Sequence, residues 1–153
     1  SGEYAELENY YQRDIAAKAA PSLLQKALDK GLRVFVKVPD TERQVFYDDF
    51  LWRYHPSAFL AHGQEGDPMP EAQPVWIGAG NVAANGARMA LVVEGAELPP
   101  LDAFELVCVL FDGENVVALE RARQQWKKLK DGGTSNMTYW KQETNGAWSK
   151  QEI

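Results

Sequence analysis

The stretch "RARQQWKKLK", residues 121–130, is the densest concentration of one charge in this chain. It carries five Lys and Arg side chains, no acidic ones and Trp126, although the whole chain has a net charge of −6. Guanidinium and ammonium groups bind carboxylates, and an indole beside them offers a flat apolar surface. The residue types therefore predict a binding surface for an anionic ligand with an apolar part, such as an acidic peptide with a hydrophobic end.

The spacing within this stretch is typical of an amphipathic helix with one positively charged edge. On a helical wheel, Arg123, Lys127 and Lys130 follow one another along the edge, and Trp126 lies at its border with the apolar side. The apolar side, which we expect to face the core, consists of Ala118, Leu119, Ala122, Trp126 and Leu129. We call Arg123, Trp126, Lys127 and Lys130 the cationic edge and take them as the candidate binding residues.

A purely structural interpretation of the cationic edge stays open at this point. Lys and Arg near a helix C-terminus interact favourably with the helix dipole, and Trp126 can simply pack inward. Glu120, three residues before Arg123, and Asp131, four residues after Lys127, would neutralise part of the edge. The exposure and the pairing of these side chains decide between the two interpretations.

A second candidate is the glycine loop "GAGNVA", residues 78–83, which follows an expected strand. Its glycine spacing fits a dinucleotide-binding loop, and Glu94 stands where such sites have an acid for the ribose. Only about nine residues separate the two flanking strands, however, whereas a parallel crossover normally needs about a dozen and a helix. In addition, the pair Asn85-Gly86 is typical of a tight turn. A small nucleotide-binding α/β enzyme that uses this loop is therefore the alternative function.

The remaining reactive residue types form no catalytic or metal-binding set. The candidates are His55, His62, Asp48, Asp49, Glu65 and Asp67. Neither histidine has a Cys or a second His at ligand spacing, and we expect the acids to be solvated. The chain has no G-x-S-x-G elbow and no phosphate-binding P-loop, and its one cysteine, Cys108, is expected in the core. We expect no catalytic residues, no metal and no cofactor.

Length and charge limit the function classes further. The 153 residues suit one domain, over 3–153, with Ser1-Gly2 as the remnant of a cleaved tag. The apolar runs are too short to cross a bilayer and no leader pattern opens the chain, so we expect a cytoplasmic protein without a membrane partner. Outside 121–130, eleven Lys and Arg face twenty-two Asp and Glu, which predicts little or no direct nucleic-acid binding. Single-stranded DNA stacked on Trp126 remains a third option.

The elements that must position these residues alternate between helix and strand. We expect helices over 14–30, 40–54 and 112–131, strands over 32–38, 75–78, 88–95 and 104–111, a loop over 62–74, and a final strand, turn and returning strand over 137–151. Gly31 and Gly132-Gly133 are expected to end the first and last helices. This order predicts a three-layer α/β domain around a central sheet.

Several segments, in order along most of the chain, resemble the chi subunit of bacterial DNA polymerase III holoenzyme. They are "LLQKALDKGLRVFV" (23–36), "FLWRYHPSAFLAHG" (50–63), "GDPMPEAQPVWI" (66–77), "NGARMALVVEGAELPPLDAFELVCVLFDG" (85–113) and "ARQQWKKLKDGGTSNMTYWKQ" (122–142). The resemblance implies a Rossmann-like domain with a mostly parallel or mixed sheet and no bound nucleotide. It also implies a non-catalytic accessory role in DNA replication.

The resemblance implies partners as well. Chi-like proteins connect the clamp loader, through a psi subunit, to single-stranded-DNA-binding protein (SSB), whose acidic C-terminal tail ends in Phe. In that family the tail-binding surface has the pattern Arg-x-x-aromatic-Lys on the last long helix, which Arg123, Trp126 and Lys127 match here. The family more often has Tyr at the aromatic place. Lys130 is added from the helical wheel, one turn further on.

Overall fold

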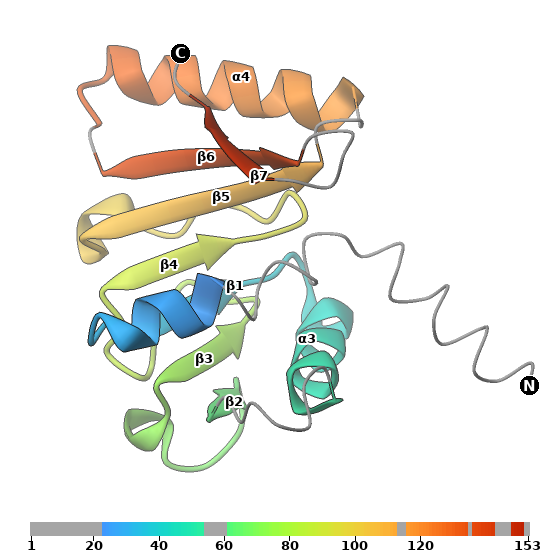
Figure 1. The fold of residues 1–153 in the computed structure, drawn as a ribbon, viewed down its shortest axis with the longest axis vertical. Helices are drawn as coiled ribbons and strands as arrows, with labels where there is room; N and C mark the ends of the chain where they lie inside the picture. Colours follow the sequence, from blue (N-terminus) through green and yellow to red (C-terminus); the bar gives the residue numbers. More distant parts are fainter. Residues whose placement is uncertain (1–22, 54–60, 113–115, 135, 143–147, 152–153) are drawn as a thin grey trace, which may run out of the picture.

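A seven-stranded sheet forms the centre of the part of the chain that the structure describes (Figure 1). The structure is a computed structural model, and it describes residues 23–53, 61–112, 116–134, 136–142 and 148–151. The strand order is β2-β3-β1-β4-β5-β6-β7, with neighbouring strands parallel except β7, which runs antiparallel to β6. The strands are β1 (Val34–Lys37), β2 (His62–Gln64), β3 (Val75–Gly78), β4 (Met89–Val92), β5 (Leu106–Asp112), β6 (Met137–Gln142) and β7 (Trp148–Gln151).

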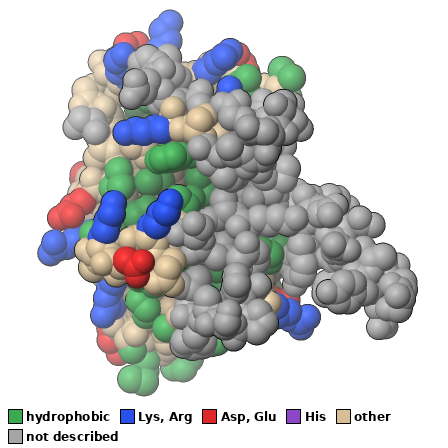
Figure 2. Space-filling view, in the orientation of Figure 1, with side chains coloured by type: hydrophobic (Ala, Val, Ile, Leu, Met, Phe, Trp, Pro, Cys, Tyr) green, Lys and Arg blue, Asp and Glu red, His purple; other side chains and the backbone are tan. Residues whose placement is uncertain are grey.

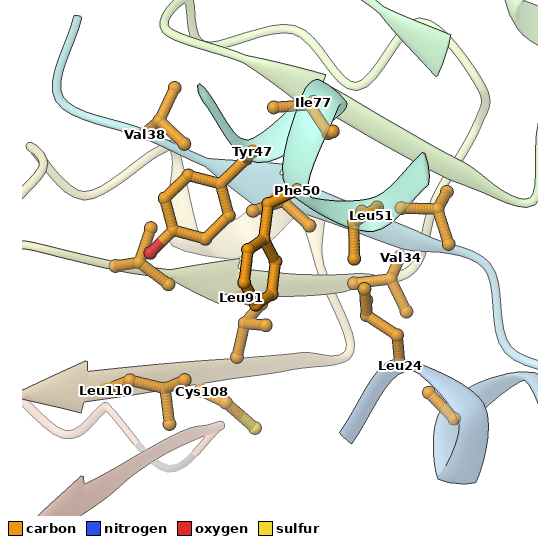
Figure 3. Packing of buried hydrophobic residues seen from close by; sticks show 14 of the residues in the cluster. Leu24, Val34, Val38, Tyr47, Phe50, Leu51, Ile77, Leu91, Cys108 and Leu110 are labelled. Carbon is orange, nitrogen blue, oxygen red and sulfur yellow. The ribbon is translucent and has the colours of Figure 1, made fainter. Parts of the chain in front are cut away.

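Helices cover both faces of this sheet, so the three-layer α/β prediction is confirmed. The helix at 23–29 and α3 (Thr41–Arg53) pack on one face, where Leu24, Tyr47 and Phe50 join side chains of β1, β4 and β5 (Figure 3). On the other face, Ala122 of α4 (Val116–Asp131) joins Phe35 and Tyr139 in a second cluster. β1 is buried along its whole length, as the continuous apolar run of a central parallel strand requires.

Three helix ends lie where the sequence placed them. The expected helix over 112–131 begins later, because Asp112 is the last residue of β5, and residues 14–22 of the first expected helix lie outside the described residues. The helix at 23–29 is followed by Gly31, whose φ of 78° is one that glycine adopts without strain. Asp40 caps α3, since its Oδ1 accepts the backbone N–H of Arg43 at 2.8 Å. After α4, Gly133 has a φ of 85° and the N–H of Thr134 donates to the carbonyl of Leu129 at 3.0 Å. The cap at Gly133 fixes the position of the last turn of α4.

One expectation about the irregular segments was wrong. The expected loop 62–74 contains β2 and the short 3-10 helix η1 (Pro70–Ala72). β2 has no alternating apolar pattern of its own, and its pairing with the edge of β3 makes it a strand. A second 3-10 helix, η2 (Leu101–Ala103), precedes β5, where the stretch "LDAFELVCVLF" predicts a short helix or turn before the buried strand.

The connection between β3 and β4 was also misjudged. The two strands are parallel to each other, because each pairs in parallel with β1 from opposite sides. Residues 79–88 nevertheless join them without a helix. They must cover two strand spacings of roughly 4.8 Å and the length of a short strand, which extended chain at about 3.3 Å per residue can do. The minimum crossover length therefore did not exclude parallel strands here.

Among the described residues, no helix combines the length and the apolar composition that a bilayer crossing would require. Cys108 is buried in β5, as predicted, with 7% of its surface exposed.

Candidate functional site

The cationic edge lies on the last long helix, α4, on the side turned away from the sheet. Ala122 is buried against the sheet, Leu119 and Leu129 are half-buried, and Arg123 and Lys127 are exposed. The amphipathic pattern predicted from the wheel is therefore confirmed. The helix presents its cations to solvent because Leu119, Ala122 and Trp126, at three- and four-residue steps, turn toward the sheet, although Val116 and Val117 of its first turn are exposed.

Trp126 lies at the border of the two sides of α4, half-buried among the apolar cluster and half accessible. The Nζ of Lys130 lies 4.6 Å from the centroid of its ring. An ammonium at this distance is attracted to the electron-rich ring face. The contact therefore holds one cation of the edge against the indole, one helical turn beyond Trp126.

Arg123 and Lys127 have no ion-pair partner within the described part of the chain. Of the two acids expected to neutralise the edge, Glu120 accepts a hydrogen bond from Nε2 of Gln124 at 3.2 Å. Two exposed, unpaired cations therefore flank an accessible indole on a chain of net charge −6. Unpaired surface cations around an apolar surface are suited to binding an anionic group at little desolvation cost.

A hydrogen bond between α4 and β6 supports the helix from behind, and sequence reasoning missed it. The hydroxyl of Tyr139 donates to Oε1 of Gln125 at 2.8 Å, and Tyr139 is 1% exposed. Burial raises the pKa of the Tyr139 phenol, so the hydroxyl keeps its proton. The alternation of β6 places Tyr139 toward α4, but a sequence does not show which residue of a neighbouring helix it meets.

The other cations of the basic stretch take different positions. Nη1 of Arg121 lies 3.1 Å from where a Cβ on Gly95 would be, so Arg121 reaches toward the turn after β4. Lys128 is exposed in the last turn of α4. The cations of residues 121–130 therefore do not form one continuous surface, and the cationic edge contains only some of them.

The glycine loop is occupied by side chains of this same chain. The Nζ of Lys37, which is 4% exposed, donates to the carbonyls of Ala79 and Gly80 and to Oδ1 of Asn81. Burial lowers the pKa of Lys37, and the charges of Glu97 and Glu65 oppose that change. The loop thus turns carbonyl oxygens toward an ammonium, whereas phosphate binding uses backbone N–H groups and the start of a helix.

Two acidic side chains near the glycine loop, Glu65 and Glu94, also lie against residues of this chain. A carboxylate oxygen of Glu65 lies 3.2 Å from where a Cβ on Gly78 would be, close to the space that a phosphate would enter. Glu94, the residue in the place of a ribose-binding acid, pairs with Nε of Arg43 at 3.0 Å. These contacts disfavour the nucleotide-binding alternative.

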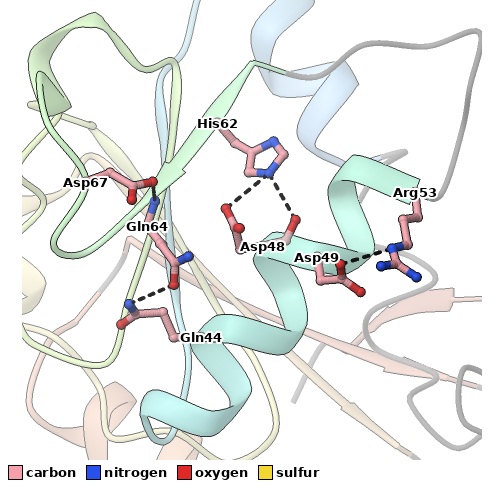
Figure 4. Close-up of polar contacts among 7 residues, drawn as sticks. All are labelled: Gln44, Asp48, Asp49, Arg53, His62, Gln64 and Asp67. Atoms are coloured by element: carbon pink, nitrogen blue, oxygen red, sulfur yellow. Dashed lines mark hydrogen bonds and ion pairs between the residues drawn. The ribbon is translucent and has the colours of Figure 1, made fainter.

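The acids of α3 and the adjoining loop make structural contacts instead of being simply solvated (Figure 4). Nε2 of His62 lies 3.1 Å from the carbonyl oxygen and 3.3 Å from Oδ1 of Asp48, and Trp52 packs on the imidazole at 4.3 Å. Burial raises the pKa of Asp48, and His62 opposes that rise. The other contacts are Asp49 with Arg53, Gln44 with Gln64, and Asp67 with the backbone N–H of Gln64. The expectation of solvated charge was therefore wrong for Asp48, which ties α3 to β2.

The described residues contain no group of three or more His, Cys, Asp or Glu side chains that could hold a metal ion. His55, the other histidine, lies outside the described residues.

Comparison with known proteins adds independent information. Residues 5–136 match the family model described as DNA polymerase III chi subunit, HolC. A curated relative, the "Probable DNA polymerase III subunit chi" of Rickettsia prowazekii (strain Madrid E), is 24% identical over 85 residues, which are 56% of this chain and 52% of the relative. The chain therefore spans about half the length of this curated relative.

Proposed function

Because the chain belongs to the DNA polymerase III chi subunit family, whose model matches most of it, we propose that it links the clamp loader to SSB as a non-catalytic subunit. It does so by binding the acidic C-terminal tail of SSB at the cationic edge. On the clamp-loader side the partner is a psi subunit or another clamp-loader subunit. The family is that of an accessory replication subunit, and the proposal adds the partners and the residues. We expect this assembly to act in the cytoplasm.

One observation carries the proposal: Arg123 and Lys127 are exposed and unpaired within the described residues, beside the accessible indole of Trp126. Glu120, the acid three residues before Arg123, is engaged by Gln124. Asp131, four residues after Lys127, forms no ion pair with it among the described residues. An acidic chain that ends in Phe offers both of the groups that this surface lacks, namely carboxylates and an apolar ring.

In the proposed complex each residue has a distinct role. The guanidinium of Arg123 binds the terminal carboxylate with two parallel hydrogen bonds, which an ammonium cannot reproduce. Lys127 attracts the acidic side chains that precede the terminus. The terminal Phe ring packs against Trp126, and Lys130, already held over the indole, adds charge at the far end. A short peptide with these contacts binds in the micromolar range, at about −8 kcal/mol.

The test is isothermal titration calorimetry with a synthetic acidic peptide ending in Phe. The wild-type chain is expected to bind it, and the variant Arg123→Glu/Lys127→Glu is expected to lose binding while its unfolding curve stays unchanged. Lys128→Glu is the matched control, because it reverses one charge of the same helix away from the edge. Equal affinity of the wild type and the double variant would reject this site.

A second assay separates the proposal from single-stranded DNA binding. The same variants are compared in gel shifts with DNA alone, where the proposal expects no complex at physiological salt. The acidic body opposes a phosphate backbone, because eleven Lys and Arg outside 121–130 face twenty-two acids.

A further inference from the structure

A second surface with binding character lies on the face of the sheet opposite α4. An apolar groove of about 410 Å³ runs between the helix at 23–29 and strands β4, β5 and β6. Its lining includes Leu23, Leu32, Met89, Leu106, Cys108 and Trp140. In Figure 2 a hollow of apolar side chains with Lys or Arg side chains on either side is visible on this face. The groove is separate from the cationic edge, because its residues belong to the other core cluster.

The floor of the groove is held in place by a chain of hydrogen bonds. Nε1 of Trp140 donates to Oγ1 of Thr138 at 3.3 Å, and that hydroxyl donates to Sγ of Cys108 at 3.2 Å. The polar hydrogen of the indole is therefore satisfied within the floor, and the ring presents its apolar surface. A preformed apolar floor of this kind costs little ordering entropy when a ligand binds.

Two lysines line the groove, and a third lies beside its floor. Lys26 and Lys30 line the groove from the 23–31 segment, four residues apart and both exposed. Lys150 of β7 pairs in register with Trp140, so both side chains leave the sheet on the same face. Its charge also acts on the thiol of Cys108, opposing the effect of burial, which raises the pKa of that thiol. None of the three lysines forms an ion pair within the described part of the chain.

We propose that this groove is a second docking surface, which binds an acidic, amphipathic peptide segment of a partner protein. The apolar side chains of the segment enter the groove, and its carboxylates meet Lys26, Lys30 and Lys150. Charge complementarity favours this occupant, because two lysines without an ion pair among the described residues line the groove and Lys150 lies opposite Trp140 of its floor, on a chain of net charge −6. A symmetric dimer through the same face would place these lysines against their own copies, which like charges oppose.

The groove and the cationic edge are independent surfaces. The two surfaces lie on opposite faces of one sheet, so the chain can hold two partners at once without competition. Both proposed ligands are acidic and partly apolar. The two surfaces differ in shape: the cationic edge offers one indole on α4, and the groove offers a long apolar floor on the other face of the sheet.

The methionines of this chain make the inference testable by NMR. The sequence has three, Met69, Met89 and Met137. Met89 lines the groove, Met137 packs on the α4 side of the sheet, and Met69 is exposed in a loop. The probe is a synthetic amphipathic peptide with Leu at every third or fourth position and Glu on its polar side, titrated into the full chain with ¹³C-labelled methionine methyl groups. We expect the Met89 signal to shift, while those of Met137 and Met69 stay in place.

Charge reversal at Lys26 and Lys30, the rim of the groove, tests whether these lysines bind the peptide's carboxylates. Lys26→Glu/Lys30→Glu is expected to weaken this titration at least tenfold, and a peptide with Lys in place of Glu is expected to bind the variant better than it binds the wild type. The control Arg123→Glu/Lys127→Glu should leave the Met89 titration unchanged, so failure at the groove and failure at the cationic edge are told apart. Unmoved Met69 and Met137 signals show that the rim variant is folded.

Three outcomes would overturn the inference. The first is that no acidic peptide shifts Met89 at millimolar concentration. The second is that decanoate shifts Met89 while the peptides do not, which would make the groove a site for small amphiphiles. The third is a protein-concentration dependence of the Met89 signal without any peptide, matched by dimerisation in analytical ultracentrifugation, which would make a second copy of the chain the occupant.

Discussion

The ammonium of Lys130 lies over the ring of Trp126, 4.6 Å from its centroid, on the exposed border of α4. The indole thereby contacts both the apolar cluster under the helix and the charged surface above it. This dual position gives the cationic edge its apolar component. It also leads to the first of the predictions below.

Replacing Trp126 should separate its binding role from its packing role. Trp126→Phe keeps a ring for the ligand's apolar end and should lower the affinity for an acidic Phe-ended peptide only a few-fold. Trp126→Ala should lower it about tenfold or more, since aromatic anchors commonly contribute more than about 1.4 kcal/mol. Calorimetry measures the affinity. Urea unfolding measures the accompanying loss of stability, and equal affinities of the two variants would contradict the role of the ring.

Arg123→Lys tests whether geometry matters as well as charge. The substitution keeps the positive charge but loses the planar pair of donors, so the affinity for a free terminal carboxylate should fall several-fold. The same variant should bind a C-terminally amidated peptide about as well as the wild type does. Both affinities should fall as salt is raised, because exposed charges are screened. If amidation has no effect on wild-type binding, Arg123 does not hold the terminal carboxylate.

Tyr139→Phe should destabilise the chain without affecting the cationic edge directly. It removes the hydrogen bond to Gln125 and leaves the half-buried amide without this partner, which costs about 1 kcal/mol. Urea unfolding checks this value. Peptide affinity should stay within a factor of two, since neither residue belongs to the edge; a large loss of affinity would mean that this bond positions α4 for binding.

Cys108 should make stability fall at alkaline pH. Burial raises the pKa of its thiol above the ordinary 9.0, so the unfolded chain releases this proton at lower pH than the folded chain does. The corresponding stability is fully present below that ordinary pKa and is lost as the pH rises through the pKa of the folded state. Unfolding free energies at about pH 8 and about pH 10 should therefore differ less in Cys108→Ala than in the wild type.

His62→Ala should weaken the connection between α3 and β2. The substitution removes the contact with Asp48 and the ring that packs on Trp52, leaving a space in a buried position. A loss of about 2–3 kcal/mol in the free energy of unfolding is expected. Peptide affinity at α4 serves as the control and should not change. A stability equal to that of the wild type would show that this contact is dispensable.

Local patterns determined much of the fold. The helix ends at Gly31 and Gly133, the apolar run of β1 and the amphipathic spacing of α4 were all readable, because helix periodicity and cap chemistry act over a few residues. β2 was not readable, since its pairing depends on the edge of β3. Contacts of that kind join residues far apart in the chain, and periodicity carries no information about them.

The candidate site divides in the same way. The sequence by itself determined that α4 would have one edge with Arg123, Trp126, Lys127 and Lys130 together, because residues three and four apart share a helix face. Only the tertiary structure decided which cations have no ion pair among the described residues, and that Lys37 and Glu65 fill the glycine loop. It also decided that Lys26 and Lys30 line one groove, with Lys150 opposite Trp140 of its floor. The physical reason is that pairing and burial depend on distances between side chains that the sheet brings together from remote parts of the chain.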